Sequence, residues 1–205
     1  MDKIFITGIG TEVGKTIASA IVVEALEADY WKPIQAGDLE NSDAHKVQAL
    51  IFNQRSHFHP NSFALNTPMS PHAAAKIDGV EITSASITVP ETKNDLVIEG
   101  AGGVLVPIND SETVLDLIKP EYKVIIVSRH YLGSINHTLL TIEALKSRNL
   151  NCFGIIFSGN ENPSTEEIIQ KMTRVQVIGR IREETAFSKE IIRNYAEEFR
   201  SRLKS

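Results

Sequence analysis

The chain has 205 residues, of which 42% are hydrophobic and 23% charged, and its formal net charge is −5. This length is enough for one domain with a sizeable core and marginal for two, so we expect residues 1–205 to form a single domain. The acidic balance, without a dense Lys/Arg run, argues against a nucleic-acid partner. The single cysteine, Cys152, allows no disulfide within the chain, and its apolar neighbours predict a small core residue.

The start of the chain leads almost directly into an apolar strand and shows no signal-type segment. No apolar run approaches the roughly 20 residues that a membrane span requires. Together with the single cysteine, these features predict a cytoplasmic protein without membrane contact.

Short apolar runs alternate with helical patterns along the chain. The predicted strands are Lys3–Thr7, Asp29–Pro33, Asp95–Glu99, Tyr122–Ser128, Cys152–Ser158 and Val175–Gly179, with a weaker edge strand at Asn61–Asn66. Several of these runs are continuously apolar, which is typical of strands buried on both faces of a parallel sheet.

Apolar residues between the strands recur at helical spacing. In the first helix Ile17, Ile21 and Ala25 form one row. Further helices are predicted around Ile135–Ile142, at Ser164–Met172 and at Phe187–Leu203. The alternation predicts an α/β fold: a doubly wound, mainly parallel sheet of about seven strands, with helices on both faces and right-handed crossovers.

The stretch over residues 53–92 is the least regular and contains four prolines. Within it, Ser70 followed by Pro71 and an alanine run predicts a helix start, with the serine as its cap. His57 and His59 lie in a polar loop without further ligands for a metal. A long excursion of this kind often covers a substrate.

A glycine-rich loop at Gly8–Thr16 lies between the first strand and the first helix. Five residues separate Gly8 from Gly14, where the usual phosphate-binding loop has four, so this loop is a variant. Glycines let backbone N–H groups turn toward phosphate oxygens, and the helix beginning at Gly14 adds its positive end. Lys15 can reach the β- and γ-phosphates, and the Thr16 hydroxyl can bind magnesium. We therefore expect a nucleoside triphosphate with Mg²⁺.

A second motif follows the strand at Asp95–Glu99, which ends in a carboxylate before Gly100-Ala101-Gly102-Gly103. Ligands collect at the carboxyl ends of parallel strands, so Glu99 would lie beside the phosphates and bind magnesium directly or through water. A strand-end carboxylate on its own more often caps a loop. The phosphate loop at the same sheet edge favours the metal role.

Two further segments contain polar residues that point to the same crevice. Lys32 ends a strand and is followed by Pro33 and Gly37, although a surface lysine at a strand end is at least as common. Asp43 lies in Asn41-Ser42-Asp43-Ala44-His45, where a helix cap or a ligand is possible and the cap is commoner for an isolated residue.

Together these segments resemble the dethiobiotin synthetase family, which uses ATP to close the ureido ring in biotin synthesis. The shared motifs are TEVGKT at Thr11–Thr16, KPxxxG at Lys32–Gly37, NSDA at Asn41–Ala44, SPH at Ser70–His72, EGAGG at Glu99–Gly103 and GxINH at Gly133–His137. The resemblance runs from residue 3 to about residue 181 and implies the fold of the P-loop NTPases.

The resemblance implies 7,8-diaminopelargonic acid as the substrate. One amine takes up CO₂ to give a carbamate, ATP phosphorylates the carbamate, and the other amine attacks the mixed anhydride. The products are dethiobiotin, ADP and phosphate. Because two anions must be held close together, cations are needed at the point of transfer. Lys15 and Lys32 are the catalytic residues that the resemblance implies.

The resemblance also implies a set of binding residues. Magnesium would be bound by Thr16, Asp43 and Glu99. The nucleotide and its metal would contact Glu12, Val13, Gly14, Lys15, Thr16, Ile17, Asp43, Glu99, Gly100, Ala101, Gly102 and Ser158. The substrate would contact Lys32, Ala36 and Gly102. The helix near Ile135 offers N–H donors for the far carboxylate of the substrate, and in the family it comes from the other subunit, which implies a homodimer.

Three positions depart from the family pattern. Ala36 stands where the family usually has a hydroxyl residue, so one polar contact to the substrate is missing or replaced. Ser158 stands where an asparagine normally reads the base, with Asn160 two residues further on. Arg182 follows Ile181 where the family has proline. These changes bear on base selectivity and leave the phosphate chemistry untouched.

Other classes of protein share parts of this pattern. A P-loop ATPase switch of the partitioning or cell-division type carries an extra lysine near the start of its phosphate loop, where this chain has Ile9-Gly10-Thr11. An amide-forming synthetase of the cobyric acid type usually carries a glutaminase domain, for which 205 residues leave no room. A related synthetase acting on another amine is a third alternative.

Overall fold

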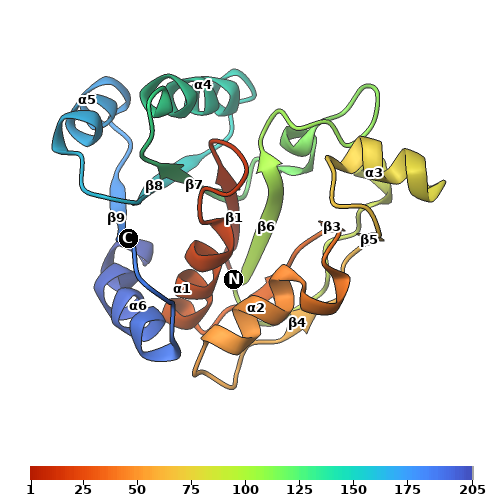
Figure 1. Ribbon diagram of the computed structural model, residues 1–205, viewed down its shortest axis with the longest axis horizontal. Helices are drawn as coiled ribbons and strands as arrows, with labels where there is room; N and C mark the ends of the chain where they lie inside the picture. The colour runs from red at the N-terminus through yellow and green to blue at the C-terminus, as the bar shows by residue number, and fades with distance from the viewer. Residues whose placement is uncertain (205) are drawn as a thin grey trace.

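The computed structural model describes residues 1–204 and contains one large parallel sheet (Figure 1). Its seven strands lie in the order β4-β2-β6-β1-β7-β8-β9, and every neighbouring pair is parallel. The strands are β1 (Lys3–Gly8), β2 (Asp29–Trp31), β4 (Phe58–His59), β6 (Leu96–Gly103), β7 (Lys123–Arg129), β8 (Cys152–Ser158) and β9 (Val177–Ile181). The predicted doubly wound α/β sheet is confirmed.

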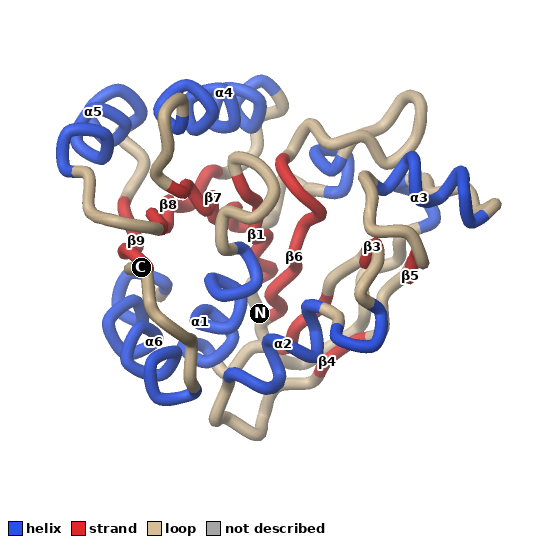
Figure 2. The backbone as a smooth tube through the Cα atoms, viewed as in Figure 1, coloured by secondary structure: helices blue, strands red, loops and turns tan. Residues whose placement is uncertain are grey.

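Helices cover both faces of this sheet (Figure 2). They are α1 (Lys15–Leu26), α2 (Asp43–Leu50), α3 (Pro71–Asp78), α4 (Ser134–Ser147), α5 (Pro163–Thr173) and α6 (Lys189–Leu203). One face carries α1, α2 and α6, and the other carries α3, α4 and α5. None of the helices within residues 1–204 is long and apolar enough to cross a bilayer.

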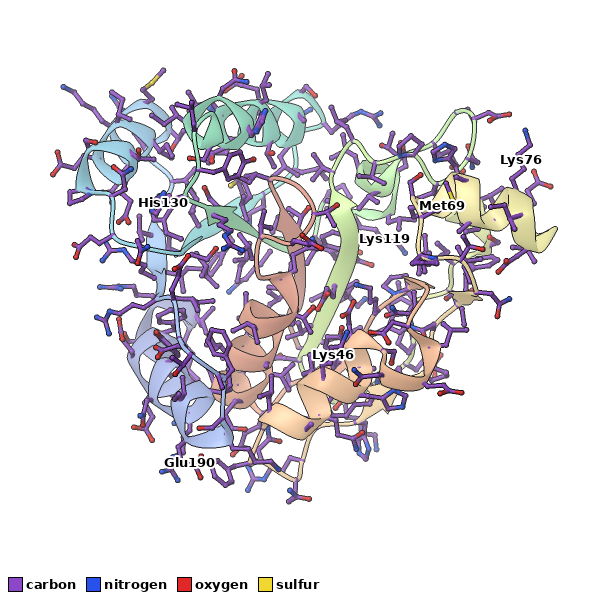
Figure 3. The ribbon with its side chains drawn as sticks, in the orientation of Figure 1. Lys46, Met69, Lys76, Lys119, His130 and Glu190 are labelled. Carbon is purple, nitrogen blue, oxygen red and sulfur yellow. The ribbon has the colours of Figure 1, made fainter. Side chains whose placement is uncertain are left out.

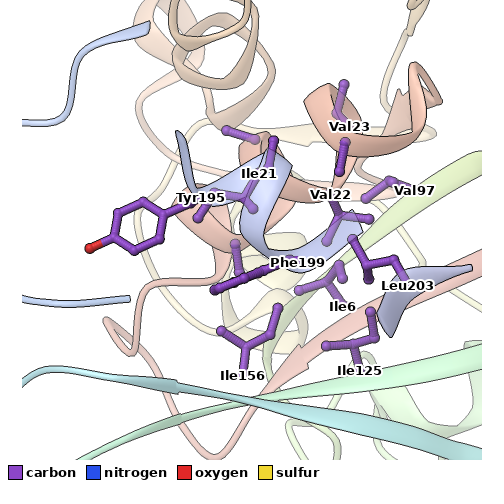
Figure 4. Close-up of a cluster of buried hydrophobic side chains, with 14 of the residues drawn as sticks. Ile6, Ile21, Val22, Val23, Val97, Ile125, Ile156, Tyr195, Phe199 and Leu203 are labelled. Atoms are coloured by element: carbon purple, nitrogen blue, oxygen red, sulfur yellow. The ribbon is translucent and has the colours of Figure 1, made fainter. Parts of the chain in front are cut away.

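The core consists of two apolar clusters, one on each side of the sheet. Ile6 of β1 and Phe199 of α6 belong to the first cluster, which Figure 4 shows. Phe5, the neighbour of Ile6, belongs to the second cluster together with Ile142 of α4. Successive residues of a strand point to opposite faces, so a strand buried on both faces must be apolar at every position. This explains the continuous apolar runs that predicted the strands.

The region after β2 differs from the prediction of one strand at Asp29–Pro33. The strand ends at Trp31, and β3 (Ile34–Ala36) pairs with β5 (Phe63–Leu65) in a separate two-stranded parallel sheet. Pro33 stands between the two strands, and proline has no N–H to continue a ladder. The chain thereby leaves the main sheet at the carboxyl end of β2.

The edge of the main sheet also differs from the prediction. The weak strand predicted at Asn61–Asn66 is present as β5, but it belongs to the small sheet. The true edge strand is β4, in the segment predicted to be a polar loop. Here His59 Nε2 lies 3.0 Å from Oδ2 of the buried Asp29, so a local contact offsets the polarity of the segment.

One helix was not identified from the sequence. Asp43 was considered as a possible helix cap. In the structure Ser42 caps α2, and Asp43 is the first residue of the helix. The backbone N–H of Ser42 donates to His45 Nδ1 at 3.1 Å, which completes the capping box. The structure also has short 3₁₀ segments, which are η1 (Leu39–Asn41), η2 (Ser84–Ser86) and η3 (Val114–Leu117).

Candidate active site

The glycine-rich loop connects β1 to α1 at the carboxyl edge of the sheet. Gly14 caps α1 with φ 97°, in the left-handed region that favours glycine. At Gly8 a Cβ atom would lie 2.5 Å from Val13 Cγ2 and 2.8 Å from the Gly10 carbonyl oxygen. Both glycines are therefore required by the turn. The N-terminus of α1 opens onto the loop, with the geometry that binds phosphate in other proteins.

Lys15 folds back over this loop. Its Nζ donates to the Gly10 carbonyl at 3.0 Å, and the residue is only 8% exposed. Burial lowers the pKa of Lys15 to about 8, because desolvation outweighs the attraction of Glu99. The ammonium is thus poorly compensated in this structure, and an anion at the loop would stabilise its charged form.

Lys32, Asp43 and Glu99 come from three segments and meet in one cluster. Lys32 Nζ lies 2.5 Å from Asp43 Oδ2 and 2.9 Å from Glu99 Oε1. Burial acts to lower the pKa of Lys32, but the Glu99 and Asp43 carboxylates outweigh it and raise the pKa above its ordinary value. Burial acts in the opposite direction on Asp43, whose pKa is nevertheless lowered by Lys32. Both partners are held in their charged forms.

Thr16 and Tyr30 complete the surroundings of Glu99, which is 1% exposed. The Thr16 hydroxyl donates to Glu99 Oε1 at 3.2 Å, and the Tyr30 hydroxyl donates to Oε2 at 3.0 Å. Burial and the Glu99 charge raise the pKa of Tyr30 well above its ordinary value, so the phenol remains a donor. The Glu99 carboxylate is therefore fixed from both oxygens.

Tyr30 and Gln35 were not identified as site residues from the sequence. Gln35 Oε1 accepts from the Asp43 backbone N–H at 3.3 Å, and its Nε2 donates to the Gly37 carbonyl at 2.9 Å. Tyr30 lies two residues before Lys32, a spacing that puts both on one side of an extended chain. That spacing was the available signal for Tyr30, whereas nothing local distinguished Gln35.

Apart from the buried Tyr30, these residues line a cavity of about 690 Å³. Its lining combines the phosphate loop and the charged cluster with apolar residues, which are Ile34, Ala36, Met69, Pro71 and Val106. Met69 lies beside the start of α3, as Figure 3 shows. The irregular segment predicted to cover a substrate thus contributes a wall of the cavity. Ala36 is half-buried in it and offers no hydroxyl.

A second cavity of about 330 Å³ adjoins the other side of the loop. Glu12, Gly14 and Ile17 line both cavities. Val13 and Ser158 line only the second, and the Ser158 hydroxyl donates to the Val13 carbonyl at 2.7 Å. The loop residues predicted from the sequence therefore line two cavities that share Glu12, Gly14 and Ile17.

Gly100 is the predicted contact residue that lines neither of these two cavities. It is buried in β6, where an added Cβ would lie 3.0 Å from the Phe5 ring. Ala101 and Gly102, which follow it, line the first cavity. Gly100 therefore has no side chain because the Phe5 ring packs closely against its backbone beneath the site.

The predicted metal ligands Thr16, Asp43 and Glu99 provide a set of oxygen donors, the chemistry that Mg²⁺ prefers. Thr16 and Glu99 are in contact, and Lys32 joins Glu99 to Asp43. Among the described residues no group of three His, Cys, Asp or Glu side chains could hold a metal, so any ion here would depend on the hydroxyl, phosphate oxygens or water. The donor set fits a magnesium–phosphate complex.

Cys152 was predicted to be a small core residue without reactivity. It is partly buried and packs against the second apolar cluster. Burial raises the pKa of its thiol to about 12, so it stays protonated at neutral pH.

The parallel sheet, the variant phosphate loop and the charged groups at one edge define a P-loop ATPase. A family model described as an AAA domain matches residues 2–190, and the chain belongs to that family. Among solved structures, the septum site-determining protein MinD of Pyrococcus horikoshii, complexed with Mg-ADP, aligns with a TM-score of 0.64 at 15% identity, covering 96% of this chain and 95% of that chain. MinD of Pyrococcus furiosus aligns with a TM-score of 0.63 at 14% identity, covering 98% and 99%. These likenesses show the fold alone.

Closer relatives identify the family within this class. ATP-dependent dethiobiotin synthetase BioD of Christiangramia forsetii is 65% identical, with 97% of this chain and 96% of the relative covered. The protein of that name from Cytophaga hutchinsonii is 51% identical, covering 96% of each. That from Chlamydia pneumoniae is 44% identical, covering 98% and 90%. The chain belongs to the ATP-dependent dethiobiotin synthetase family, and the alternative as a partitioning-type switch is not supported.

Proposed function

We propose that this protein is an ATP-dependent dethiobiotin synthetase, which closes the ureido ring on 7,8-diaminopelargonic acid with CO₂. The observation that carries the proposal is the placement of Lys32 between Asp43 and Glu99, in the same cavity as Lys15 of the phosphate loop. A phosphoryl transfer between two anions needs this convergence of cations.

The reaction divides into three steps. One amine of the substrate adds to CO₂ and loses a proton to give a carbamate. A carbamate oxygen attacks the γ-phosphorus of ATP, and the bond to the ADP oxygen breaks. The second amine attacks the carbonyl carbon, phosphate leaves, and the amine loses its proton. Activation is required because an unmodified carbamate is a poor electrophile.

Each lysine would hold one of the two anions. Lys15, at the N-terminus of α1, would hold the triphosphate, whose charge would raise the lowered pKa of this group. Lys32 is charged and would hold the carbamate, with Asp43 and Glu99 directing its Nζ. The remaining phosphate contacts would come from the backbone of Glu12–Ile17, and Ala101 and Gly102 would approach from β6. Holding both reactants in one cavity lowers the entropic cost of the transfer.

Mg²⁺ would be held by Thr16, Asp43 and Glu99, and when bound it neutralises phosphate charge. The support for this is that the three side chains carry oxygen donors and that Tyr30 holds the far oxygen of Glu99. Asp43 is held in turn through Gln35. These contacts fix the donors before an ion arrives.

The substrate would lie along the apolar residues of the first cavity, with its amines toward Lys32. Ile34, Met69 and Val106 offer apolar surface to a hydrocarbon chain. Ala36 would pack against the chain, in place of the hydroxyl contact of the family. Gly102, with φ 70°, lets the backbone approach closely, since a Cβ there would lie 2.8 Å from Val106 Cγ2.

We also propose a homodimer that binds the far carboxylate of the substrate at the N-terminus of α4, with Gly133 as its cap. Apolar surface near this helix supports the proposal, because Leu105 and Leu140 are 62% and 58% exposed. Light scattering should give twice the chain mass. Leu140→Glu should give monomers that have lost turnover, and a wild-type monomer that turns over would contradict the proposal.

We further propose that residues 1–205 act as one synthetase domain in the cytoplasm, where ATP is available. The two apolar clusters share the single large sheet, which supports treatment as one unit.

The test is to mix the purified protein with 7,8-diaminopelargonic acid, bicarbonate, Mg²⁺ and ATP. Phosphate release should require the diamine, and mass spectrometry should detect dethiobiotin in equal amount. Omitting bicarbonate from degassed buffer is the control for carbamate formation. Tight Mg·ATP binding without diamine-dependent turnover would contradict the proposed reaction and leave only the nucleotide site.

A further inference from the structure

The turn at Arg182-Glu183-Glu184 follows β9 and forms part of the wall of the second cavity. Ile17, Ile181 and Phe187 give this cavity apolar sides, which suit the faces of a planar base. Because Glu12 and Gly14 line both cavities, a triphosphate on the loop would place its nucleoside here. The inference below rests on the proposed function, since it concerns how ATP is selected.

Ser158 does not offer a hydroxyl proton to this cavity. Its Oγ donates to the Val13 carbonyl at 2.7 Å, and the residue is 7% exposed. A hydroxyl has one proton, so this contact leaves none for a base nitrogen or carbonyl. Ser158 therefore supports the backbone of the phosphate loop and can only accept a hydrogen bond from a base, so any donor to the base must come from another part of the wall.

Tyr195 of α6 fixes the turn from behind. Its hydroxyl accepts from the Arg182 backbone N–H at 3.0 Å and donates to Glu184 Oε1 at 2.7 Å. The ring is 5% exposed and packs against Phe199 with 5.9 Å between centroids. Figure 4 shows the hydroxyl pointing away from the apolar cluster that holds the ring. A rigid core residue is thus attached to both ends of a three-residue turn.

This attachment depends on the departure at residue 182. A proline there would have no N–H to donate to Tyr195. Burial raises the pKa of Tyr195, with Glu184 adding to the effect, so the phenol keeps the proton that it donates. The middle residue of the turn, Glu183, has longer contacts, at 3.5 Å to Arg129 and 3.4 Å to Asn160.

We propose that Tyr195 is a positioning residue for nucleotide base selection: through Arg182 and Glu184 it holds the turn that walls the second cavity. Removing its hydroxyl frees the turn without changing the phosphate loop. Affinity for the nucleoside part of ATP then falls, and discrimination between bases weakens, while recognition of the phosphates is retained.

Tyr195→Phe in the full-length protein tests this proposal. Calorimetry would measure Mg²⁺-dependent binding of ATP, CTP, GTP and inorganic triphosphate, which has no base. The dissociation constant for ATP should rise about fivefold, the size expected when hydrogen bonds worth about 1 kcal/mol are lost. The constant for triphosphate should stay within about twofold, and the preference for ATP over CTP and GTP should shrink.

Two further variants separate positioning from general damage. Tyr122→Phe is the matched control, because its buried hydroxyl has no hydrogen-bond partner among residues 1–204 and it lies in the second apolar cluster. It should leave all four constants unchanged. Glu184→Ala removes one end of the attachment and should reproduce the Tyr195→Phe effect on ATP in the same direction.

In turnover, Tyr195→Phe should raise KM for ATP and leave kcat and the KM for the diamine unchanged. Equal losses of ATP and triphosphate affinity would overturn the proposal, since they indicate a disturbed phosphate loop. Unchanged ATP affinity and selectivity in Tyr195→Phe would overturn it as well, whereas diamine-dependent turnover by the wild type would leave the proposed function intact. Failure of the wild type to bind ATP would overturn both.

Discussion

The two ends of the proposed site are built in different ways. The transfer end contains Lys15, Lys32 and Glu99, and the base end is the wall of the second cavity at residues 182–184. At the transfer end Lys15, Lys32 and Glu99 are 8%, 6% and 1% exposed, and each has a charged or hydrogen-bonded neighbour. At the base end Arg182 and Glu183 are exposed, and the wall is held by a turn attached to α6. One end is a buried ionic network, and the other is a surface turn.

This difference predicts different sensitivity to substitution. In a buried network the loss of one partner leaves another charge without compensation, which costs several kcal/mol. At an exposed turn, water replaces lost contacts and the cost is about 1 kcal/mol or less. Two of the three departures from the family pattern, Ser158 and Arg182, fall at the base end, and the third, Ala36, lines the first cavity beside the substrate.

The largest effect is expected for Lys32→Met. It removes the cation that would hold the carbamate, and turnover should fall by at least about 100-fold. It also leaves Asp43 and Glu99 facing each other, which should destabilise the fold by about 3 kcal/mol at neutral pH. Steady-state kinetics and denaturant titration measure the two effects.

Lys76→Met is the control, because Lys76 is exposed on α3 and the same change should be nearly neutral there. In Lys32→Met the pKa of Asp43 should rise, because burial acts to raise it and the Lys32 charge that lowers it is gone. The lost stability should therefore return as pH falls and a carboxylate takes up a proton. If Lys32→Met and Lys76→Met lowered turnover and stability equally, burial of Lys32 in the ionic network would not explain the effect.

Tyr30→Phe should act on the metal rather than on the nucleotide. The buried phenol donates to Glu99 Oε2, so its loss frees the carboxylate to turn. The Mg²⁺ concentration for half-maximal ADP binding should rise about tenfold, as for other groups that orient metal ligands. Tyr122→Phe serves as the control. An unchanged Mg²⁺ dependence would show that Glu99 needs no support from Tyr30.

ATP affinity should depend on pH through Lys15. Its pKa of about 8 in the ligand-free protein means that the ammonium is present below pH 8 and is lost above it. Since the triphosphate binds the charged form, affinity should fall above pH 8 by up to about tenfold per unit, with uptake of a proton. Calorimetry in buffers of different ionisation enthalpy measures this uptake.

Lys15→Arg is the comparison for this experiment, because a guanidinium keeps its charge throughout the range. The variant should bind ATP with little change between pH 7 and 9. If Lys15→Arg showed the same pH dependence as the wild type, the proton taken up on ATP binding would belong to a group other than Lys15.

The smallest effect is expected for Ser158→Ala. The change removes the hydrogen bond to the Val13 carbonyl, and it should weaken ATP and triphosphate equally, by about threefold. Base selectivity should not change, in contrast to Tyr195→Phe. A change of base preference in Ser158→Ala would show that this hydroxyl reads the base after all.

Much of the architecture was predictable because its signals are local. Buried parallel strands need apolar residues at every position, so β1, β7 and β8 were identified within one residue at either end. The phosphate loop was identified for the same reason, since its turn requires Gly8 and Gly14 wherever it occurs. Resemblance then supplied the roles of the residues that single motifs left open.

Pairing and orientation were decided by the tertiary structure. The sequence indicated a strand at β5 but not that Pro33 and β3 would draw it into a separate sheet. It indicated Lys32 and Glu99 at two strand ends, but not the Tyr30 phenol that fixes Glu99. These contacts join segments far apart in the chain, so no local period records them.

The base end shows the same division most clearly. Ser158 and Arg182 stood out in the sequence as departures, and the sequence alone assigned both to base selectivity. The fold turned the Ser158 hydroxyl into the phosphate loop and placed Tyr195 behind residue 182. The sequence by itself determined which residue types were present, because strands, loop and motifs follow from local chemistry. Only the tertiary structure decided which partners these residues have, Val13 for Ser158 and Tyr195 for Arg182, because a hydrogen bond depends on where atoms far apart in the chain meet.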